Sequence, residues 1–194
     1  MKKRSPRILR FILAAILSSA AAGATAQGDA GRAAQAFEVV RSVLQHPRCQ
    51  NCHIPGDAPR QHDTSVRHDI NVQRGPSGNG ATAMECSSCH GAENLPESYG
   101  LHVPPGAPAW RLPPPETKMV FIDLSPAELC AVIKNPRATA GKDLHAMLVH
   151  IRDDKLVAWG WRPGLGRNPV PVPRDRFVAA FQEWMSLGAP CPAS

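Results

Sequence analysis

The sequence predicts a small, mainly α-helical single domain in which short helices are joined by long Pro/Gly-rich loops. Apolar residues recur at helical spacing in four segments, and no segment has the alternating pattern of a confident strand. The chain also holds 20 prolines, and several of them cluster between the helical segments. Aromatic residues make up only 5% of the chain, so the core lacks the large rings that normally fill one.

The first 26 residues are typical of a secretory signal peptide. "MKKRSPRILR" is basic, "FILAAILSSAAAG" is apolar, and "ATA" at 24–26 places small residues before Gln27. The apolar run is shorter than the roughly 20 residues of a membrane span. We therefore expect export to the periplasm, a mature domain of residues 27–194, and no stable membrane span after cleavage.

Cleavage would also change the charge balance. Five of the 22 Lys and Arg residues lie in the leader, which leaves 17 basic residues against 16 acidic ones in the mature chain. No Lys/Arg-rich run remains, so the sequence does not predict a nucleic-acid-binding face.

Two helices are predicted in the first two thirds of the chain. Residues 33–45 place Phe37 and Leu44 on one face, and Pro47 ends this helix just before a cysteine-rich motif. Residues 125–136 begin with Ser125 as N-cap and have Glu128 three residues later, which is a capping box.

Two further helices are predicted towards the C-terminus, and long loops separate the predicted elements. Residues 142–154 and 174–188 each carry an apolar stripe, and Gly188 is a stop signal for the second. The main loops are "RGPSGNG" (74–80) and "VPPGAPAWRLPPPE" (103–116). Loops this long are uncommon in a compact domain unless something else holds them.

A five-residue pattern occurs twice, as "CQNCH" at 49–53 and "CSSCH" at 86–90. Two thiols three residues apart can bond to the two vinyl groups of a porphyrin, and the adjoining His then lies beneath the iron as proximal ligand. The pattern predicts two covalent heme c groups, whose rings would also supply the missing core bulk. Their binding residues would be Cys49, Cys52 and His53 for the first and Cys86, Cys89 and His90 for the second.

Three other uses of these cysteines explain the pattern less completely. Disulfides are common in exported proteins, but they leave the two histidines without a role. A structural zinc ribbon usually separates its Cys pairs by about 15–20 residues, fewer than here. A thioredoxin-like redox pair would follow a β-strand, and no run of β-branched residues precedes either motif.

The short distance between the motifs favours one dihaem cytochrome c domain over two tandem domains. Too few residues separate them for an independent core, and haems this close in sequence should lie close in space. Cys130 and Cys191 remain, and in an oxidising compartment we expect them to form a disulfide.

Several stretches together resemble a family of small exported dihaem c-type proteins commonly labelled as a subunit of isoquinoline oxidoreductase. The resemblance covers about three-quarters of the precursor and is carried by "CQNCH", "NVQRG", "CSSCH", "LPPPE", "SPAELC", "DLHAMLVHIRDDKLVAWGW" and "GAPCP". It implies an electron-transfer partner of a molybdenum hydroxylase (a molybdopterin oxidoreductase), which would pass electrons towards a respiratory acceptor.

The distal iron ligands are ambiguous in the sequence because His and Met are both usual sixth ligands. The candidates are His46, His62, His68, His102, His145, His150, Met84, Met119, Met147 and Met185. We favour Met119, which lies in a non-helical stretch after a proline run, and His68 and His150. The working hypothesis is Met119 on one haem and His68 or His150 on the other.

Two classes of function remain open, with a third less favoured. A relay would have two six-coordinate irons and no catalytic activity of its own, whereas a dihaem enzyme of peroxidase type would keep one iron open. The relay is favoured because such peroxidases are longer chains. A gas-binding sensor with an open haem is the third alternative.

Overall fold

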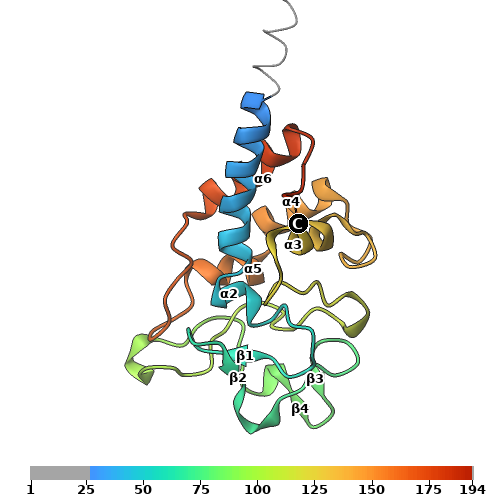
Figure 1. The fold of residues 1–194 in the computed structure, drawn as a ribbon. Coiled ribbons are helices and arrows are strands. Elements are labelled where there is room, and N and C mark those ends of the chain that lie inside the picture. The colour runs from blue at the N-terminus through green and yellow to red at the C-terminus, as the bar shows by residue number, and fades with distance from the viewer. Residues whose placement is uncertain (1–26, 194) are drawn as a thin grey trace, which may run out of the picture.

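The computed structural model describes residues 27–193, so the predicted signal peptide and Ser194 lie outside the described residues. The described chain divides into a half made of helices and a half made mainly of loops (Figure 1). Both Cys-x-x-Cys-His motifs lie in or beside the loop half. The predicted mainly α-helical class is confirmed, and none of the described helices is both long and apolar enough to cross a membrane.

The N-terminal helix covers residues 27–44 of the described chain and is longer than the predicted segment 33–45. The extra residues form the sequence "QGDAGR", which holds two glycines and has no apolar stripe to reveal a helix. Phe37 and Val40 of this helix are fully buried, and the ring of Phe37 lies 5.3 Å from that of Trp184.

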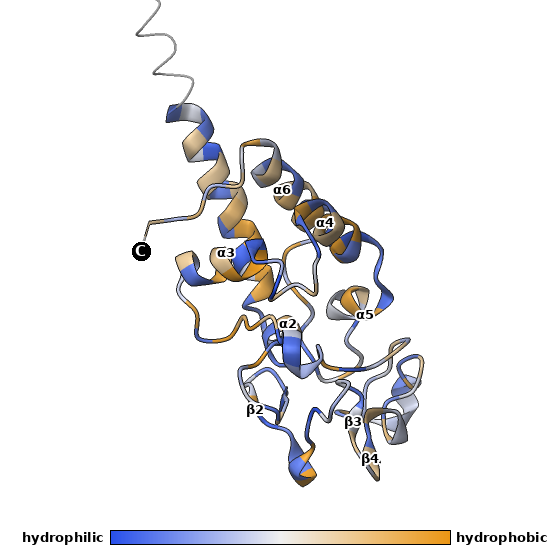
Figure 2. Ribbon diagram, turned by 90° about the vertical axis from the view of Figure 1, so that its right-hand side faces the viewer, coloured by the Kyte–Doolittle hydropathy of each residue, from blue (hydrophilic) through white to orange (hydrophobic). Residues whose placement is uncertain are grey.

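The other long helices match the predicted segments closely. They are α3 (Pro126–Lys134), α4 (Leu144–Asp153) and α6 (Arg174–Ser186). The capping box of α3 is present, since the Ser125 hydroxyl accepts from the Glu128 amide and the Glu128 carboxylate accepts from the Ser125 amide. Figure 2 shows the apolar residues gathered on these helices, where they form the core.

The expected disulfide between Cys130 and Cys191 is present. It ties α3 to the C-terminal tail, which Figure 1 places beside that helix. Cys130 is fully buried, so the crosslink is anchored in the core.

The remaining elements are short. Two helices of four residues are α2 (Pro47–Gln50) and α5 (Lys155–Ala158). Strands β1 (Arg60–Gln61) and β2 (Val66–Arg67) pair antiparallel, as do β3 (Gly80–Ala81) and β4 (Met84–Glu85). No strand was expected, because two-residue strands are too short to leave an alternating pattern in the sequence.

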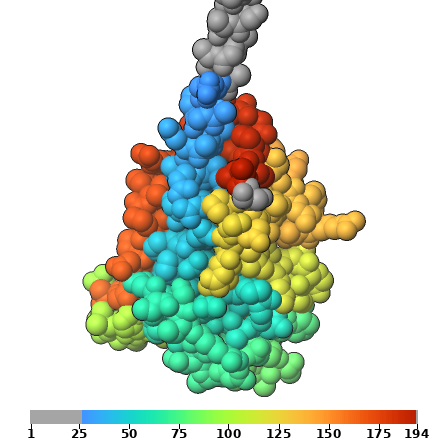
Figure 3. Space-filling view, in the orientation of Figure 1, coloured from blue at the N-terminus to red at the C-terminus, as the bar shows by residue number. Residues whose placement is uncertain are grey.

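One buried arginine holds the long loops together. The Arg74 side chain is 1% exposed, and its guanidinium donates to the main-chain carbonyls of Ile54, Gly56 and Pro113. Three loops, at residues 54–56, 74 and 113, are therefore joined at one point. In Figure 3 the helical half and the loop half form one continuous surface.

Candidate functional site

The first Cys-x-x-Cys-His motif begins on α2. The His46 ring caps this helix by accepting from the Arg48 amide at 3.2 Å, and Pro47 supplies a suitable φ at the first position. The turn continues past the helix, because the Cys52 and His53 amides both donate to the Cys49 carbonyl. Both thiols and the His53 ring are thus presented from one compact turn.

The His53 ring is fixed by a distant loop. Its Nδ1–H donates to the Met119 carbonyl at 2.8 Å, and the ring stacks on Phe121 with centroids 4.0 Å apart. Burial lowers the pKa of His53 to about 4, so the ring is neutral near pH 7. A neutral ring that donates from Nδ1 keeps its lone pair on Nε2, which is the arrangement usual in metal-bound histidines.

A cavity of about 400 Å³ opens beside this motif. Such a volume is within the range of small-molecule and cofactor sites. Burial raises the pKa of Cys49 to about 12 and that of Cys52 to about 11, so both thiols stay protonated at neutral pH. A protonated thiol is a poor redox nucleophile, which agrees with the argument against a thioredoxin-like pair.

Two of the favoured distal ligands line this cavity. His150 reaches it from α4, and its Nδ1 lies 3.2 Å from the Asp154 carboxylate. Burial lowers the pKa of His150. Met119 also lines the cavity, but its main chain has a φ of +49° and directs the carbonyl to His53. The main-chain carbonyl of Met119 therefore points to His53, the histidine of the first motif.

The second motif lies at the surface in a 3₁₀ turn (Cys86–Ser88) after β4. Cys86 is half-buried and Cys89 is exposed. The His90 ring repeats the arrangement of the first motif, because its Nδ1–H donates to the Pro105 carbonyl at 2.7 Å. It also stacks on Trp110, and burial lowers its pKa.

The third favoured ligand, His68, faces the second motif. Its ring centroid lies 6.2 Å from that of His90, with 63° between the ring planes. A metal held by two opposed imidazoles separates the ring centres by about 6 Å, because each bond is about 2 Å and each ring centre lies about 1 Å beyond its nitrogen. The His68 Nδ1–H donates to the Asp69 carbonyl, so His68 leaves Nε2 available as His53 and His90 do.

The other seven candidates lie in less suitable positions. His46 is used as a helix cap, and the rings of His62 and His102 pack against each other at 5.1 Å, too close for a metal between them. Met147 packs in the core beside the cavity. His145 and Met84 are exposed, and Met185 packs against the core.

Two tryptophans that the sequence did not single out connect the two motifs. Trp110 stacks on His90, lies edge-on to Trp159 at 4.9 Å, and lines the first cavity together with Trp159. Asn94 fixes this contact, since its Oδ1 accepts from the Trp159 indole and from the Gly106 amide. A Cβ on Gly106 would lie 1.9 Å from the Glu93 carbonyl, so only glycine fits next to Pro105.

The residues present fit two covalent porphyrins. Each motif offers two thiols and a neutral imidazole oriented through Nδ1, the first beside a cavity and the second opposite another imidazole. Within residues 27–193, no group of three or more His, Cys, Asp or Glu side chains gathers as a ready-made metal site. The chain has no match among protein-family models, curated proteins or solved structures.

Proposed function

We propose that this chain is a periplasmic electron-transfer protein that carries two covalently bound c-type haems. Cys49, Cys52 and His53 would hold the first, and Cys86, Cys89 and His90 would hold the second. The observation that carries the proposal is the matching environment of the two motif histidines. Each donates Nδ1–H to a main-chain carbonyl and turns Nε2 away from that bond, although the two carbonyls belong to different loops.

For the second haem, the separation of His68 and His90 supports ligation by two histidines. Ile70 follows His68 by two residues with 70% of its surface exposed, and Val66 precedes it by two with 47% exposed. Ile70 also has a φ of +50°, which makes this β-branched residue a backbone outlier. Exposed apolar side chains on both sides of His68, with local strain at Ile70, suit a segment that lies against a porphyrin.

For the first haem, the cavity supports His150 as the distal ligand. The Asp154 carboxylate orients the His150 ring through Nδ1, as outer carboxylates do for metal-bound histidines. The Met119 carbonyl orients His53, which suits a supporting role for Met119. The geometry therefore favours a pair of bis-histidine haems over the mixed-ligand hypothesis, in which Met119 is itself a ligand.

A haem bound in this way supplies reversible one-electron chemistry at its iron. Burial lowers the pKa of His53, His90 and His150, and the two motif histidines are fixed against the aromatic rings of Phe121 and Trp110. Trp110 and Trp159 bring the two sites into contact. By the family resemblance, the donor would be a molybdenum hydroxylase-type dehydrogenase and the acceptor a component of the respiratory chain.

Carbon monoxide binding to the ferrous protein tests the relay. If both irons carry two protein ligands, the spectrum of the untreated ferrous protein should not change promptly when carbon monoxide is added. A prompt change equivalent to one haem would show an open iron, contradict the relay and favour an enzyme of peroxidase type or a gas sensor.

A further inference from the structure

Arg48 is a buried cation whose hydrogen bonds are incomplete. Its side chain is 2% exposed, and one terminal nitrogen pairs with the Asp63 carboxylate. Its Nε is buried and has no hydrogen-bond partner, while the side chain lines the first cavity and lies 5.8 Å over the Trp159 ring. Leaving a buried charged donor without a partner is destabilising, so a further acceptor is expected.

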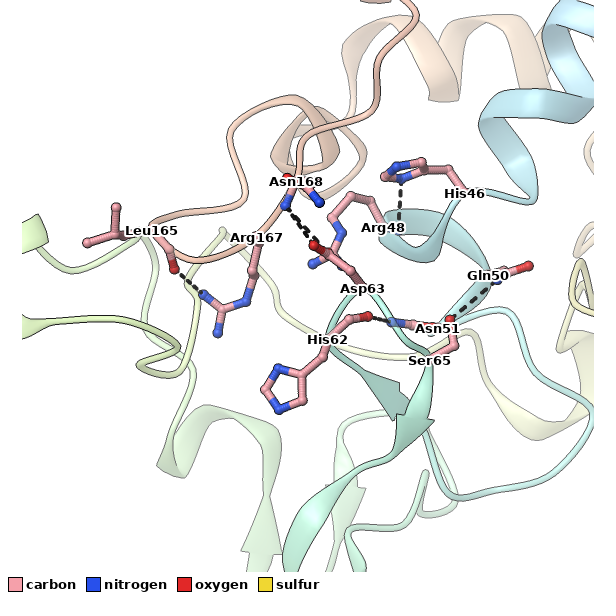
Figure 4. Close-up of polar contacts among 10 residues, drawn as sticks. All are labelled: His46, Arg48, Gln50, Asn51, His62, Asp63, Ser65, Leu165, Arg167 and Asn168. Atoms are coloured by element: carbon pink, nitrogen blue, oxygen red, sulfur yellow. Dashed lines mark hydrogen bonds and ion pairs between the residues drawn. The ribbon is translucent and has the colours of Figure 1, made fainter.

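A second arginine belongs to the same cluster of side chains. Arg167 donates to the Val103 carbonyl at 2.7 Å and to the Leu165 carbonyl at 3.5 Å, but to no carboxylate. Asn168, the next residue, donates its main-chain amide at 3.2 Å to the Asp63 carboxylate that pairs with Arg48, so the two arginine segments meet at Asp63. Figure 4 shows Arg167 and Arg48 on either side of Asp63 and Asn168.

Asp63 cannot satisfy both cations. Its carboxylate is already engaged by Arg48 and by the Asn168 amide at 3.2 Å. Arg48 alone pairs with this carboxylate, Arg167 pairs with none, and the local charge is therefore positive. A pair of guanidinium groups is well suited to bind a carboxylate or a phosphate.

The cluster also lies between the two motifs. Arg48 directly precedes Cys49, and Arg167 donates to the Val103 carbonyl, two residues before the Pro105 whose carbonyl holds His90. The anionic groups that two haems would bring to this place are the propionate carboxylates on their rims.

We propose that Arg48 and Arg167 together form the binding site for a haem propionate, with Asp63 holding Arg48 in position. This inference rests on the proposed function. One propionate fills the missing acceptor position at Arg48 Nε and neutralises the excess positive charge. Both arginines then act on the potential of the same haem, because a nearby cation disfavours the more positive ferric iron.

The test is a spectroscopic redox titration of the purified protein and of three variants. Arg167→Gln removes one half-buried charge, and Arg48→Lys keeps the charge but loses the Nε donor, which leaves the propionate less well neutralised. Each variant should lower the midpoint potential of one haem, and the haem should be the same in both. Arg176→Gln on α6 removes the same charge from an exposed position and should change neither midpoint potential.

The titration also identifies the source of the anion. If the two arginine variants shift different waves, or neither wave, the shared propionate site is wrong. If inorganic phosphate moves the potentials of the unmodified protein and Arg167→Gln abolishes that response, the cluster binds a free anion and the inference is overturned. If the unmodified protein carries no haem at all, the proposed function is contradicted. Failure of the propionate site and failure of the proposed function therefore give different results.

Discussion

The indole of Trp110 lies parallel to the imidazole of His90, with ring centroids 4.4 Å apart and 4° between the planes. Together with the bond from Nδ1 to the Pro105 carbonyl, this stack leaves the His90 ring little freedom to rotate. Because Trp110 also touches Trp159 in the first cavity, the orientation of one motif histidine is coupled to the packing of the other site.

Replacing Trp110 should change the second haem more than the first, because His90 loses its stacking partner whereas the first cavity loses one of many lining residues. Trp110→Leu removes the flat surface against which His90 packs, so the angle between the His90 and His68 planes should vary. We expect one of the two low-spin ferric signals in the electron paramagnetic resonance spectrum to broaden or shift. Trp110→Phe retains a ring and should restore the signal, whereas equal change of both signals would show general disruption.

Removing a distal histidine should open one iron selectively. His68→Ala should allow carbon monoxide to bind the second ferrous haem, and His150→Ala should allow it to bind the first. His145 is an exposed residue on the same helix as His150, so His145→Ala is the matched control and should bind no carbon monoxide. The assignments are contradicted if either histidine variant remains closed to carbon monoxide.

The role of Met119 separates two ligand schemes. If its carbonyl only orients His53, Met119→Ala should leave both irons six-coordinate and shift the potentials little, because the carbonyl belongs to the main chain. If its thioether is a ligand, the variant should lose the weak far-red absorption of a ferric Met–haem bond and one potential should fall. The far-red spectrum decides between the two schemes.

Arg74 should contribute strongly to stability. Arg74→Ala would leave the buried carbonyls of Ile54, Gly56 and Pro113 without their donor, at an expected cost of about 3 kcal/mol or more. Urea unfolding of the haem-containing protein measures this cost. Arg67→Ala, an exposed arginine on β2, should change the free energy of unfolding by less than about 0.5 kcal/mol.

The sequence predicts the helices well because their signals are local. The capping box at Ser125 and the apolar spacing along α4 and α6 lie within a few residues of the structure that they specify. The first turns of the N-terminal helix and the two-residue strands carry no comparable pattern. The disulfide followed from the count of cysteines that remained and from the expected compartment.

In the candidate site, too, only the features encoded by neighbouring residues could be predicted from the sequence. The Cys-x-x-Cys-His motifs are contiguous, so they can be recognised without a fold. The carbonyls that orient His53 and His90 cannot be recognised from the sequence, because any residue can supply a carbonyl. Only the folded loops bring Met119 and Pro105 into place. Arg48 was missed for a different reason, since arginine is usually exposed and its burial depends on Asp63 and Trp159.

The most direct test of two covalent haems is the mass of the denatured protein after expression with export and haem attachment. The account predicts a red polypeptide whose mass exceeds that of the mature chain by two haems, and a Cys49→Ala, Cys52→Ala variant that carries one haem fewer. A polypeptide without bound haem, or a double variant that retains both haems, would contradict it.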